Sequence, residues 1–297
     1  MRPAERGFLL LSSHLGDPNR RPLTTAQLRT LADRSWKLDS RDADRQLQRR
    51  DLTALGYGPA MADRILELLS QGELLDSYLQ TARQQGCYPI TRVSEHYPLI
   101  VRKRLGLDSP GVLWGKGDAA ILNSPMVALV GSRDIRPENR RFAEEVGRQA
   151  AIQGYTLVSG NARGADRTAQ EACLAAGGRV IVVVADALTD HTEKDRTLYL
   201  SEEGFDQAFS AQRALSRNRV IHCLANLVLV AQCTLGTGGT WDGTMRNLRC
   251  GWSPVCCFRD GSDAARQLQE MGAQPVALEQ LGHLEQIHIP QPSFFDQ

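Results

Sequence analysis

The chain has 297 residues, and its 35 Lys and Arg stand against 34 Asp and Glu, which gives a formal net charge of +1. Hydrophobic residues make up 42% of the chain and charged residues 23%, a globular composition that excludes a disordered or fibrous protein. The balanced charge excludes a uniformly basic surface for nucleic acid but is compatible with a local basic cleft.

The cysteines and the apolar stretches predict a cytoplasmic protein that is not bound to a membrane. The seven cysteines are odd in number and show no C-x-x-C spacing, so neither a disulfide framework nor a zinc ribbon is expected. Residues 8–11 are too short an apolar run for a signal peptide, and residues 220–233 are too short and too polar to cross a bilayer. The histidines form no metal-spacing cluster, and we expect neither a bound metal nor a cofactor.

The first part of the chain, to about residue 85, has a helical pattern. Thr24 is placed to cap a first helix. Residues 39–50 are strongly charged, as in a solvated helix or a loop. A Gly-Tyr-Gly-Pro break at 56–59 then separates two helical runs. Small modules that bind the DNA backbone are built from two helices around a glycine-containing turn, but the simpler interpretation is a plain helical hairpin.

A connecting region rich in Gly and Pro, expected to contain a short strand, spans residues 97–117, and beyond it strands and helices alternate. We expect strands at residues 126–130, 155–158, 179–185, 227–231 and 254–258, with another near 275–277. The helices are expected at 139–153, 166–176, 241–248 and 263–271. This alternation predicts an α/β fold with a Rossmann-like, doubly wound, mostly parallel sheet. We divide the chain into an N-terminal helical domain with its connector (1–118) and the sheet domain (119–297).

Right-handed crossovers place the loops that follow the strands at one edge of such a sheet, and ligands bind at that edge. The first of these loops is Gly131-Ser132-Arg133. Gly131 lets the backbone turn tightly, Ser132 offers a hydroxyl and Arg133 offers a planar cation. Together they suit a phosphate, although a glycine after a strand is also an ordinary turn residue.

The second loop runs from Ser159 to Asp166 and includes Gly160, Arg163 and Gly164. It leads into the N-terminus of a helix, whose free amide groups attract anions. Asp166 has two interpretations, as the N-cap of that helix or as a ligand contact. The loop is neither G-x-G-x-x-G nor G-x-x-x-x-G-K-[ST], so a nicotinamide-dependent dehydrogenase or an NTPase is not expected.

The third loop contains Gly236-Thr237-Gly238-Gly239-Thr240, between an apolar strand and a helical run. Successive small residues can form a backbone nest that holds an anion. The alternative for this loop is a flexible surface segment.

The segment Ser216-Arg217-Asn218-Arg219 is expected at the start of an apolar helix over residues 220–224. Two arginines at a helix start can clamp a phosphate backbone. The alternative is a solvated helix end.

Three further polar residues lie near these segments. His191 and Lys194 fall in a polar loop after the third strand, close to the expected ligand edge, where either can contact a phosphate. His222 lies in an apolar run and is interpreted as a core histidine.

The motifs at 130–133 (Val-Gly-Ser-Arg), 159–166 (Ser-Gly-x-Ala-Arg-Gly-x-Asp), 175–178 (Ala-Ala-Gly-Gly) and 216–221 (Ser-Arg-Asn-Arg-Val-Ile) resemble the DNA-processing protein A (DprA, or Smf) family. The resemblance covers most of residues 20–260. It implies a Rossmann-like domain behind a small helical domain, binding of single-stranded DNA, transfer of that strand to a recombinase during transformation, and often a homodimer. The site residues that it implies are Gly131, Ser132, Arg133, Ser159, Gly160, Arg163, Gly164, Arg217, Asn218 and Arg219, with Lys194 as a looser match.

The chain also departs from that family. Its polar loop 190–196 replaces the Tyr-Pro and following Asn that the family commonly has, and no winged-helix tail is expected after Gly282. Its loop 236–240 is closer to nucleotide-binding relatives, which include phosphoribohydrolases. Asp242 occupies a place comparable to the catalytic Glu of those enzymes.

We therefore expect a protein that binds single-stranded DNA, with a role in DNA processing, recombination or uptake, rather than an enzyme. The contacts would be to phosphates, because the motifs offer Gly, Ser and Arg and no aromatic platform for stacking bases. The alternative is a nucleotide sensor or an N-glycosidic hydrolase that uses the loop 236–240, with Asp242 or Asp166 as the acid or base.

Overall fold

The computed structural model describes residues 1–35 and 46–287, and its centre is a single nine-stranded sheet. The strands are β1 (Cys87–Thr91), β2 (Val112–Gly117), β3 (Met126–Gly131), β4 (Thr156–Ser159), β5 (Arg179–Val183), β6 (Thr197–Ser201), β7 (Leu227–Gln232), β8 (Val255–Phe258) and β9 (Gln274–Val276). Their order across the sheet is β1-β2-β6-β5-β4-β3-β7-β8-β9. The predicted α/β fold with a doubly wound sheet is confirmed.

The sheet is parallel from β6 to β9, and only β1 and β2 run antiparallel to their neighbours. The central strands are continuous apolar runs because helices cover both of their faces. The expected connector contains β2, the short strand predicted there, and β1 lies in the residues before it. β6 is a strand that was not expected, and its Thr197-Leu-Tyr-Leu-Ser pattern is buried throughout because it lies between β2 and β5.

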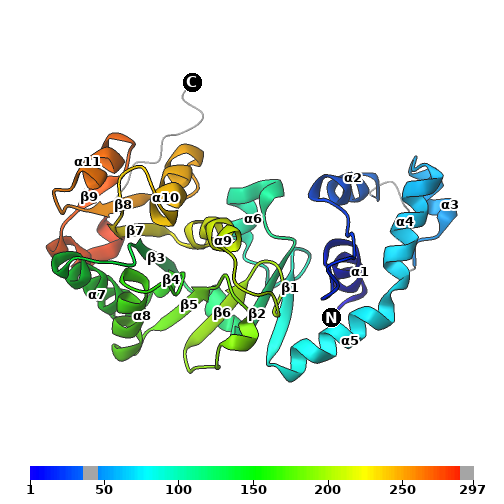
Figure 1. The fold of residues 1–297 in the computed structure, drawn as a ribbon, viewed down its shortest axis with the longest axis horizontal. Helices are drawn as coiled ribbons and strands as arrows, with labels where there is room; N and C mark the ends of the chain where they lie inside the picture. The colour runs from blue at the N-terminus through cyan, green and yellow to red at the C-terminus, as the bar shows by residue number, and fades with distance from the viewer. Residues whose placement is uncertain (36–45, 288–297) are drawn as a thin grey trace.

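Helices cover the two faces of the sheet (Figure 1). They are α6 (Leu99–Leu105), α7 (Pro137–Ile152), α8 (Ala165–Ala175), α9 (Ala211–Leu224), α10 (Gly239–Cys250) and α11 (Asp263–Glu270), with 3-10 helices η2 (Gly106–Asp108), η3 (Ala119–Asn123), η4 (Leu188–Asp190) and η5 (Leu278–Gln286). One core cluster lies under α7, α8 and η5, and a second lies under α6, α9, α10 and α11. The described residues contain no helix that is both long and apolar enough to cross a membrane.

Within residues 1–35 and 46–84, five helices precede the sheet and lie to its right in Figure 1: α1 (Pro3–Ser12), α2 (Thr25–Ser35), α3 (Arg49–Ala54), α4 (Pro59–Ser70) and α5 (Gly72–Gln84). Thr24 caps α2 as expected, since its Oγ1 accepts from Gln27 N (3.3 Å) and Gln27 Oε1 accepts from Thr24 N (2.9 Å). The expected break between α3 and α4 is present. The charged segment 39–50 lies mostly outside the described residues.

The N-terminal helices have a small apolar core of their own and also contact the sheet. Tyr78 of α5 packs against Trp114 of β2 with ring centroids 5.3 Å apart, and both rings contact Phe205. The proposed boundary at 118/119 would assign β1 and β2 to the N-terminal domain, although β2 pairs with β6. That division stays a prediction.

Candidate functional site

The order of the strands creates a switch point at the carboxyl edge of the sheet. From β3 the chain moves through β4 and β5 to β6 on one side, and then through β7 and β8 to β9 on the other. The loops that follow β3 and β7 therefore lead to helices on opposite faces and leave room between them.

A cavity of about 560 Å³ occupies this position, bounded by the loop after β3, by α9 and by the N-terminus of α10. We call it the α9–α10 cavity. The predicted site residues that line it are Gly131, Ser132, Arg133, Asp166, Arg217, Asn218, Thr237, Gly238, Gly239 and Thr240. Residues far apart in the sequence thus meet at the expected edge.

Two hollows of about 370 and 460 Å³ continue from this cavity along the same edge. Arg133 lines all three, and Arg163 lines both of the smaller ones. We call these two hollows the arginine groove. Gly160 lies in one of them and Gly164 in the other. The Arg133 guanidinium is exposed and has no ion pair or hydrogen bond within residues 1–35 and 46–287. Its charge is therefore available to a ligand.

Three predicted glycines serve close packing rather than a backbone cradle for an anion. A Cβ on Gly131 would lie 2.4 Å from the Ala165 Cβ, and one on Gly164 (φ +84°) would lie 2.3 Å from the Arg133 carbonyl oxygen. A Cβ on Gly160 would overlap the Arg217 guanidinium, 1.8 Å from Nη1. These glycines allow the loops after β3 and β4 and the side chain of Arg217 to meet.

Asp166 does not cap α8, because the N-cap position is Gly164. The buried Asp166 carboxylate instead accepts hydrogen bonds from Gly160 N (3.0 Å) and Ala162 N (3.2 Å). Burial raises the pKa of Asp166, while the charge of Arg217 opposes that shift. Asp166 thus holds the second loop and uses amides that could otherwise bind an anion.

Arg217 is buried, with 9% of its surface exposed. Its Nη2 donates to the Gly160 carbonyl oxygen (2.7 Å), and its Nε is buried with no partner in the described part of the chain. Burial lowers the pKa of this guanidinium, and the carboxylates of Asp166 and Asp186 oppose the shift. Arginine remains charged even so, and among the described residues only the Nη2 of Arg217 donates a hydrogen bond.

The segment 216–219 does not begin a helix as expected. α9 begins at Ala211, where Ser210 Oγ accepts from Arg213 N (3.0 Å), so the segment lies in the middle of α9. Residues two apart in a helix face different sides. Arg219 accordingly turns away from the cavity and forms an ion pair with the buried Glu202 carboxylate (2.9 Å).

Two of the predicted site residues, Asn218 and Thr240, connect the walls of the cavity to one another. Asn218 Nδ2 donates to the Gly239 carbonyl oxygen (3.1 Å), and Thr240 Oγ1 donates to the Gly131 carbonyl oxygen (3.0 Å). These bonds fix the N-terminus of α10 against α9 and β3.

Several predicted residues line none of the three hollows. Ser159 is buried and its Oγ accepts from Gln170 Nε2, Lys194 is exposed in the loop before β6, and Gly236 is exposed in its loop. Asp242 is exposed in the first turn of α10. Asp242 lies outside the lining of the cavity, whereas the Asp166 carboxylate lines it and accepts from two loop amides; a role of either as the acid or base of a hydrolase stays a prediction.

Three residues at the site were given no ligand role from the sequence. Phe209 is 59% exposed and lines both the α9–α10 cavity and the groove, although it belongs to no motif. Asp186 lines the groove and pairs with His191, whose Nε2 lies 2.9 Å from Asp186 Oδ1. His222, expected in the core, is indeed buried but also lines the cavity. A lone aromatic and isolated polar residues carry no signal of spacing, which is why sequence reasoning missed them.

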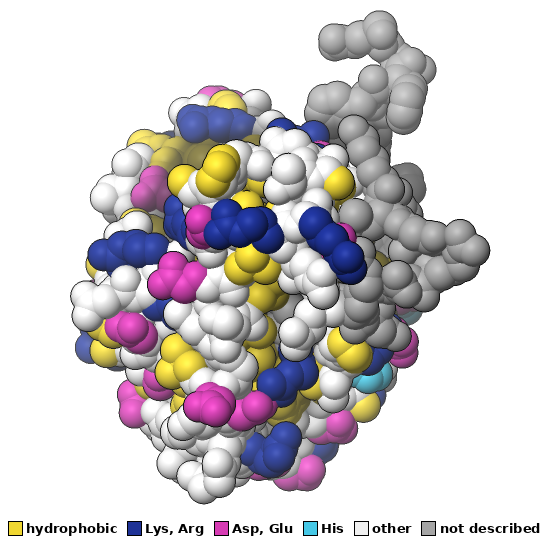
Figure 2. All heavy atoms as spheres, turned by 90° about the vertical axis from the view of Figure 1, so that its right-hand side faces the viewer, with side chains coloured by type: hydrophobic (Ala, Val, Ile, Leu, Met, Phe, Trp, Pro, Cys, Tyr) yellow, Lys and Arg dark blue, Asp and Glu magenta, His cyan; other side chains and the backbone are white. Residues whose placement is uncertain are grey.

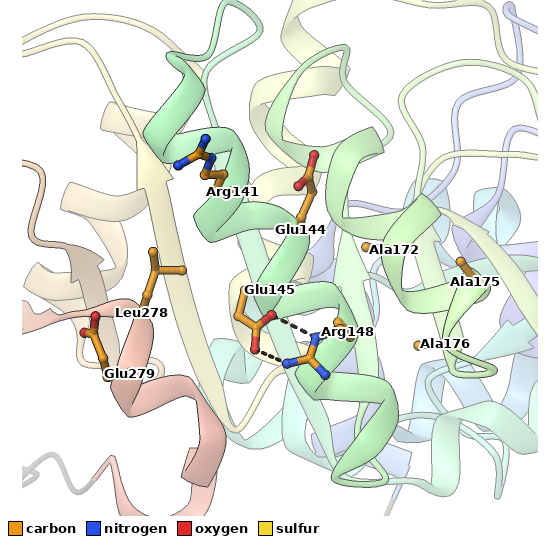
Figure 3. Close-up of a pocket in the computed structure, with 9 residues that line it drawn as sticks. All are labelled: Arg141, Glu144, Glu145, Arg148, Ala172, Ala175, Ala176, Leu278 and Glu279. Carbon is orange, nitrogen blue, oxygen red and sulfur yellow. Dashed lines mark hydrogen bonds and ion pairs between the residues drawn. The ribbon is translucent and has the colours of Figure 1, made fainter.

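A larger hollow of about 840 Å³ lies between α7, α8 and η5 (Figure 3). Three alanines form part of its lining, and Glu145 and Arg148 face each other in an ion pair (2.5 Å). Its lining carboxylates, from Glu144, Glu145 and Glu279, outnumber its two arginines. The alanines come from the C-terminal end of α8, which lies toward the opposite edge of the sheet. This hollow is therefore a poor site for an anion.

The N-terminal helices also present many charges of both signs. Figure 2 shows Lys and Arg interspersed with Asp and Glu on this side of the molecule. Among the ion pairs here, Arg6 joins Asp76 (2.5 Å), Arg29 joins Asp33 (3.6 Å) and Arg49 joins Asp63.

A mostly parallel sheet with a donor-rich arginine site at its switch point defines a Rossmann-like protein with a candidate anion site. The sequence model for the DNA recombination-mediator protein A family matches residues 89–282. The chain belongs to this family.

Known proteins resemble the chain over the same region. It is 32% identical over 187 residues to DNA processing protein DprA of Streptococcus pneumoniae, covering 57% of this chain and 64% of that protein. It is 29% identical over 170 residues to DprA of Bacillus subtilis, covering 53% and 56%. The chain thus spans less than two thirds of the length of these curated relatives.

Solved structures show the same fold. The structure of DprA from Streptococcus pneumoniae matches 98% of this chain and 100% of its own, with a TM-score of 0.72 and 23% identity. DprA from Helicobacter pylori, described for its single-stranded DNA binding mode, matches 64% of this chain and 90% of its own, with a TM-score of 0.53 and 24% identity.

Proposed function

We propose that the chain binds single-stranded DNA, with the phosphate backbone lying in the arginine groove and reaching the α9–α10 cavity. The single observation that carries this proposal is the convergence of Arg133, Arg163 and Arg217 on adjoining hollows at the switch point. Arg163 is paired with Asp134 (2.9 Å) and Arg217 interacts with the carboxylates of Asp166 and Asp186, whereas Arg133 forms no ion pair within the described residues and its charge is not already neutralised. Unneutralised arginines are what a polyanion requires.

The bases have a surface to contact in this arrangement. Phe209 (59% exposed) and Leu215 (51% exposed) stand on the rim of the α9–α10 cavity. Stacking of one base on an aromatic side chain contributes about 1–3 kcal/mol and tolerates any sequence. We therefore revise the expectation of phosphate contacts alone and include Phe209 as a base contact.

Family membership supports this function. The curated relatives are named for DNA processing, and the Helicobacter pylori relative is described as binding single-stranded DNA. On that basis we propose a role in DNA processing, recombination or uptake, with a recombinase and a second copy of the chain as partners.

The test is fluorescence anisotropy of a labelled oligo-dT over a salt series. Arg133→Ala removes one phosphate contact, so we expect affinity to fall about tenfold, as for a charge-assisted hydrogen bond. The slope of log K against log salt should also become shallower by about 0.7 for each phosphate that the protein no longer neutralises. Arg179→Ala is the matched control, because Arg179 is exposed at the start of β5, away from the carboxyl edge. Equal weakening in both variants would contradict the proposed site.

A further inference from the structure

The floor of the α9–α10 cavity contains a histidine that the proposed function does not use. His222 is 1% exposed and lines the cavity from α9. Gly243 of α10 lies directly above it, and a Cβ there would come within 3.3 Å of His222 Nε2. The absence of a side chain at Gly243 lets α10 approach α9 this closely.

A buried network fixes which nitrogen of His222 carries the proton. Ser253 N donates to Asn247 Oδ1 (2.9 Å), so the Asn247 amide must direct its Nδ2 toward His222 Nδ1 (3.1 Å). Nδ2 can only donate, and His222 Nδ1 must therefore accept. The Ser253 hydroxyl donates to the His222 carbonyl oxygen (2.8 Å) and closes the network.

The proton of the neutral imidazole consequently lies on Nε2, which has no partner in the described part of the chain. Burial and the charge of Arg217 lower the pKa of His222 to about 4, so the ring is neutral at pH 7. Nε2–H is thus a fixed, neutral donor at the cavity floor.

Two other unused sets of donors face the same cavity. The 12-residue helix α10 begins after Gly238 with no side-chain cap, so the first amides of the helix are free. Arg217 is more than nine-tenths buried and makes one hydrogen bond, to the Gly160 carbonyl oxygen. The donors therefore converge from α9 and from α10.

We propose that the α9–α10 cavity binds a phosphomonoester, the group found at a phosphorylated strand end or in a mononucleotide. A phosphomonoester has three terminal oxygens and one ester link, so it can enter a recess with donors on several sides. A phosphodiester within a strand has two such oxygens and must leave on both sides. The cavity opens into the arginine groove along shared lining residues, which lets a strand lie in the groove while its end enters.

This inference rests on the proposed function and can fail separately from it. The experiment compares oligo-dT bearing a 5′-phosphate, a 3′-phosphate or only hydroxyl ends, labelled at an internal position. We expect one terminal phosphate to raise affinity about tenfold, as one added charge-assisted contact does. Equal affinity for all three oligonucleotides would overturn the inference and leave DNA binding intact. Failure of all three to bind would overturn the proposed function itself.

Two substitutions assign the effect to His222. His222→Gln keeps an N–H donor and His222→Met has similar volume without one, so only the methionine variant should reduce the affinity ratio between phosphorylated and hydroxyl ends toward one. Thermal unfolding of both variants verifies that they fold. Thymidine 5′-monophosphate and thymidine serve as competitors, and removal of the phosphate preference by the monophosphate alone would support recognition of the shared group. A ratio that is unchanged in His222→Met would contradict the role of His222.

Discussion

The N-terminal helices and the carboxyl edge of the sheet both carry arginines, but their surroundings differ. Arg6, Arg29 and Arg49 each pair with a carboxylate at the surface. At the sheet edge, Arg163 also pairs with a surface carboxylate, that of Asp134, whereas Arg133 has no such partner among the described residues and Arg217 is buried beside Gly160. What distinguishes the sheet edge is therefore the convergence of its arginines: Arg133 and Arg217 line one cavity, whereas Arg50 and Arg83 of the N-terminal helices line none of the hollows described above.

The largest effect that we expect is a pH dependence of the free energy of unfolding that arises from His222 at the sheet edge. His222 has its pKa lowered from 6.5 to about 4 in the folded protein, because it is buried near Arg217. The unfolded chain takes up a proton on His222 near pH 6.5, whereas the folded protein does so only near pH 4. The contribution of the neutral imidazole to the free energy of unfolding is therefore fully present above pH 6.5 and is lost as the pH falls toward 4. The loss amounts to at most about 3 kcal/mol.

Urea unfolding of the wild type and of His222→Gln between pH 7 and pH 4 measures this contribution. The glutamine variant should show a shallower decline of the unfolding free energy over that interval. Parallel declines in both proteins would contradict the account, because other titratable groups would then cause the whole dependence.

The second prediction concerns the second loop. Asp166→Ala removes the buried carboxylate oxygen, Oδ2, that accepts from both loop amides, so Gly160 N and Ala162 N lose their acceptor. We expect the free energy of unfolding to fall by about 2 kcal/mol, as when a buried polar group loses its partner. Denaturant unfolding measures it, and a change below about 0.5 kcal/mol, within the range of surface substitutions, would be inconsistent with this role.

The third prediction tests the packing of Arg217 on a glycine. Gly160→Ala places a methyl group where the guanidinium now lies. Overpacking of this kind costs about 1–3 kcal/mol, and displacement of Arg217 should lower oligo-dT affinity about tenfold. Gly7→Ala is the control, since no atom lies within 4 Å of a Cβ there. Full affinity in Gly160→Ala would show that Arg217 need not occupy its present position.

The smallest effect is expected in the N-terminal helices. Arg29→Ala breaks an exposed pair four residues apart in α2. Such pairs contribute about 0.3–0.5 kcal/mol, so neither stability nor oligo-dT affinity should change measurably. A fall in affinity as large as that of Arg133→Ala would place the DNA on the N-terminal helices.

The sequence predicted the α/β fold well because the central strands are uninterrupted apolar runs. It predicted the meeting of Gly131–Arg133, Arg217 and Gly238–Thr240, since parallel strands bring their following loops to one edge. It did not predict the packing roles of Gly131, Gly160 and Gly164, because motif spacing does not show which atoms oppose a missing Cβ. Nor could it separate Arg217 from Arg219, which required the true start of α9 at Ala211.

Phe209 and β6 were also missed, because their positions depend on contacts between distant parts of the chain. Phe209 stands in an irregular segment before α9, so only the fold brings it to the cavity rim. β6 is short, and its polar Thr and Ser are buried only because of the neighbouring strands.

The most direct test of the central claim is hydrogen–deuterium exchange of the full chain with and without oligo-dT. The account predicts slower exchange on binding at residues 131–133, 160–164 and 234–241, and no change over α2, α3 and α4. Protection confined to those N-terminal helices, with the loops of the sheet edge unaffected, would contradict it.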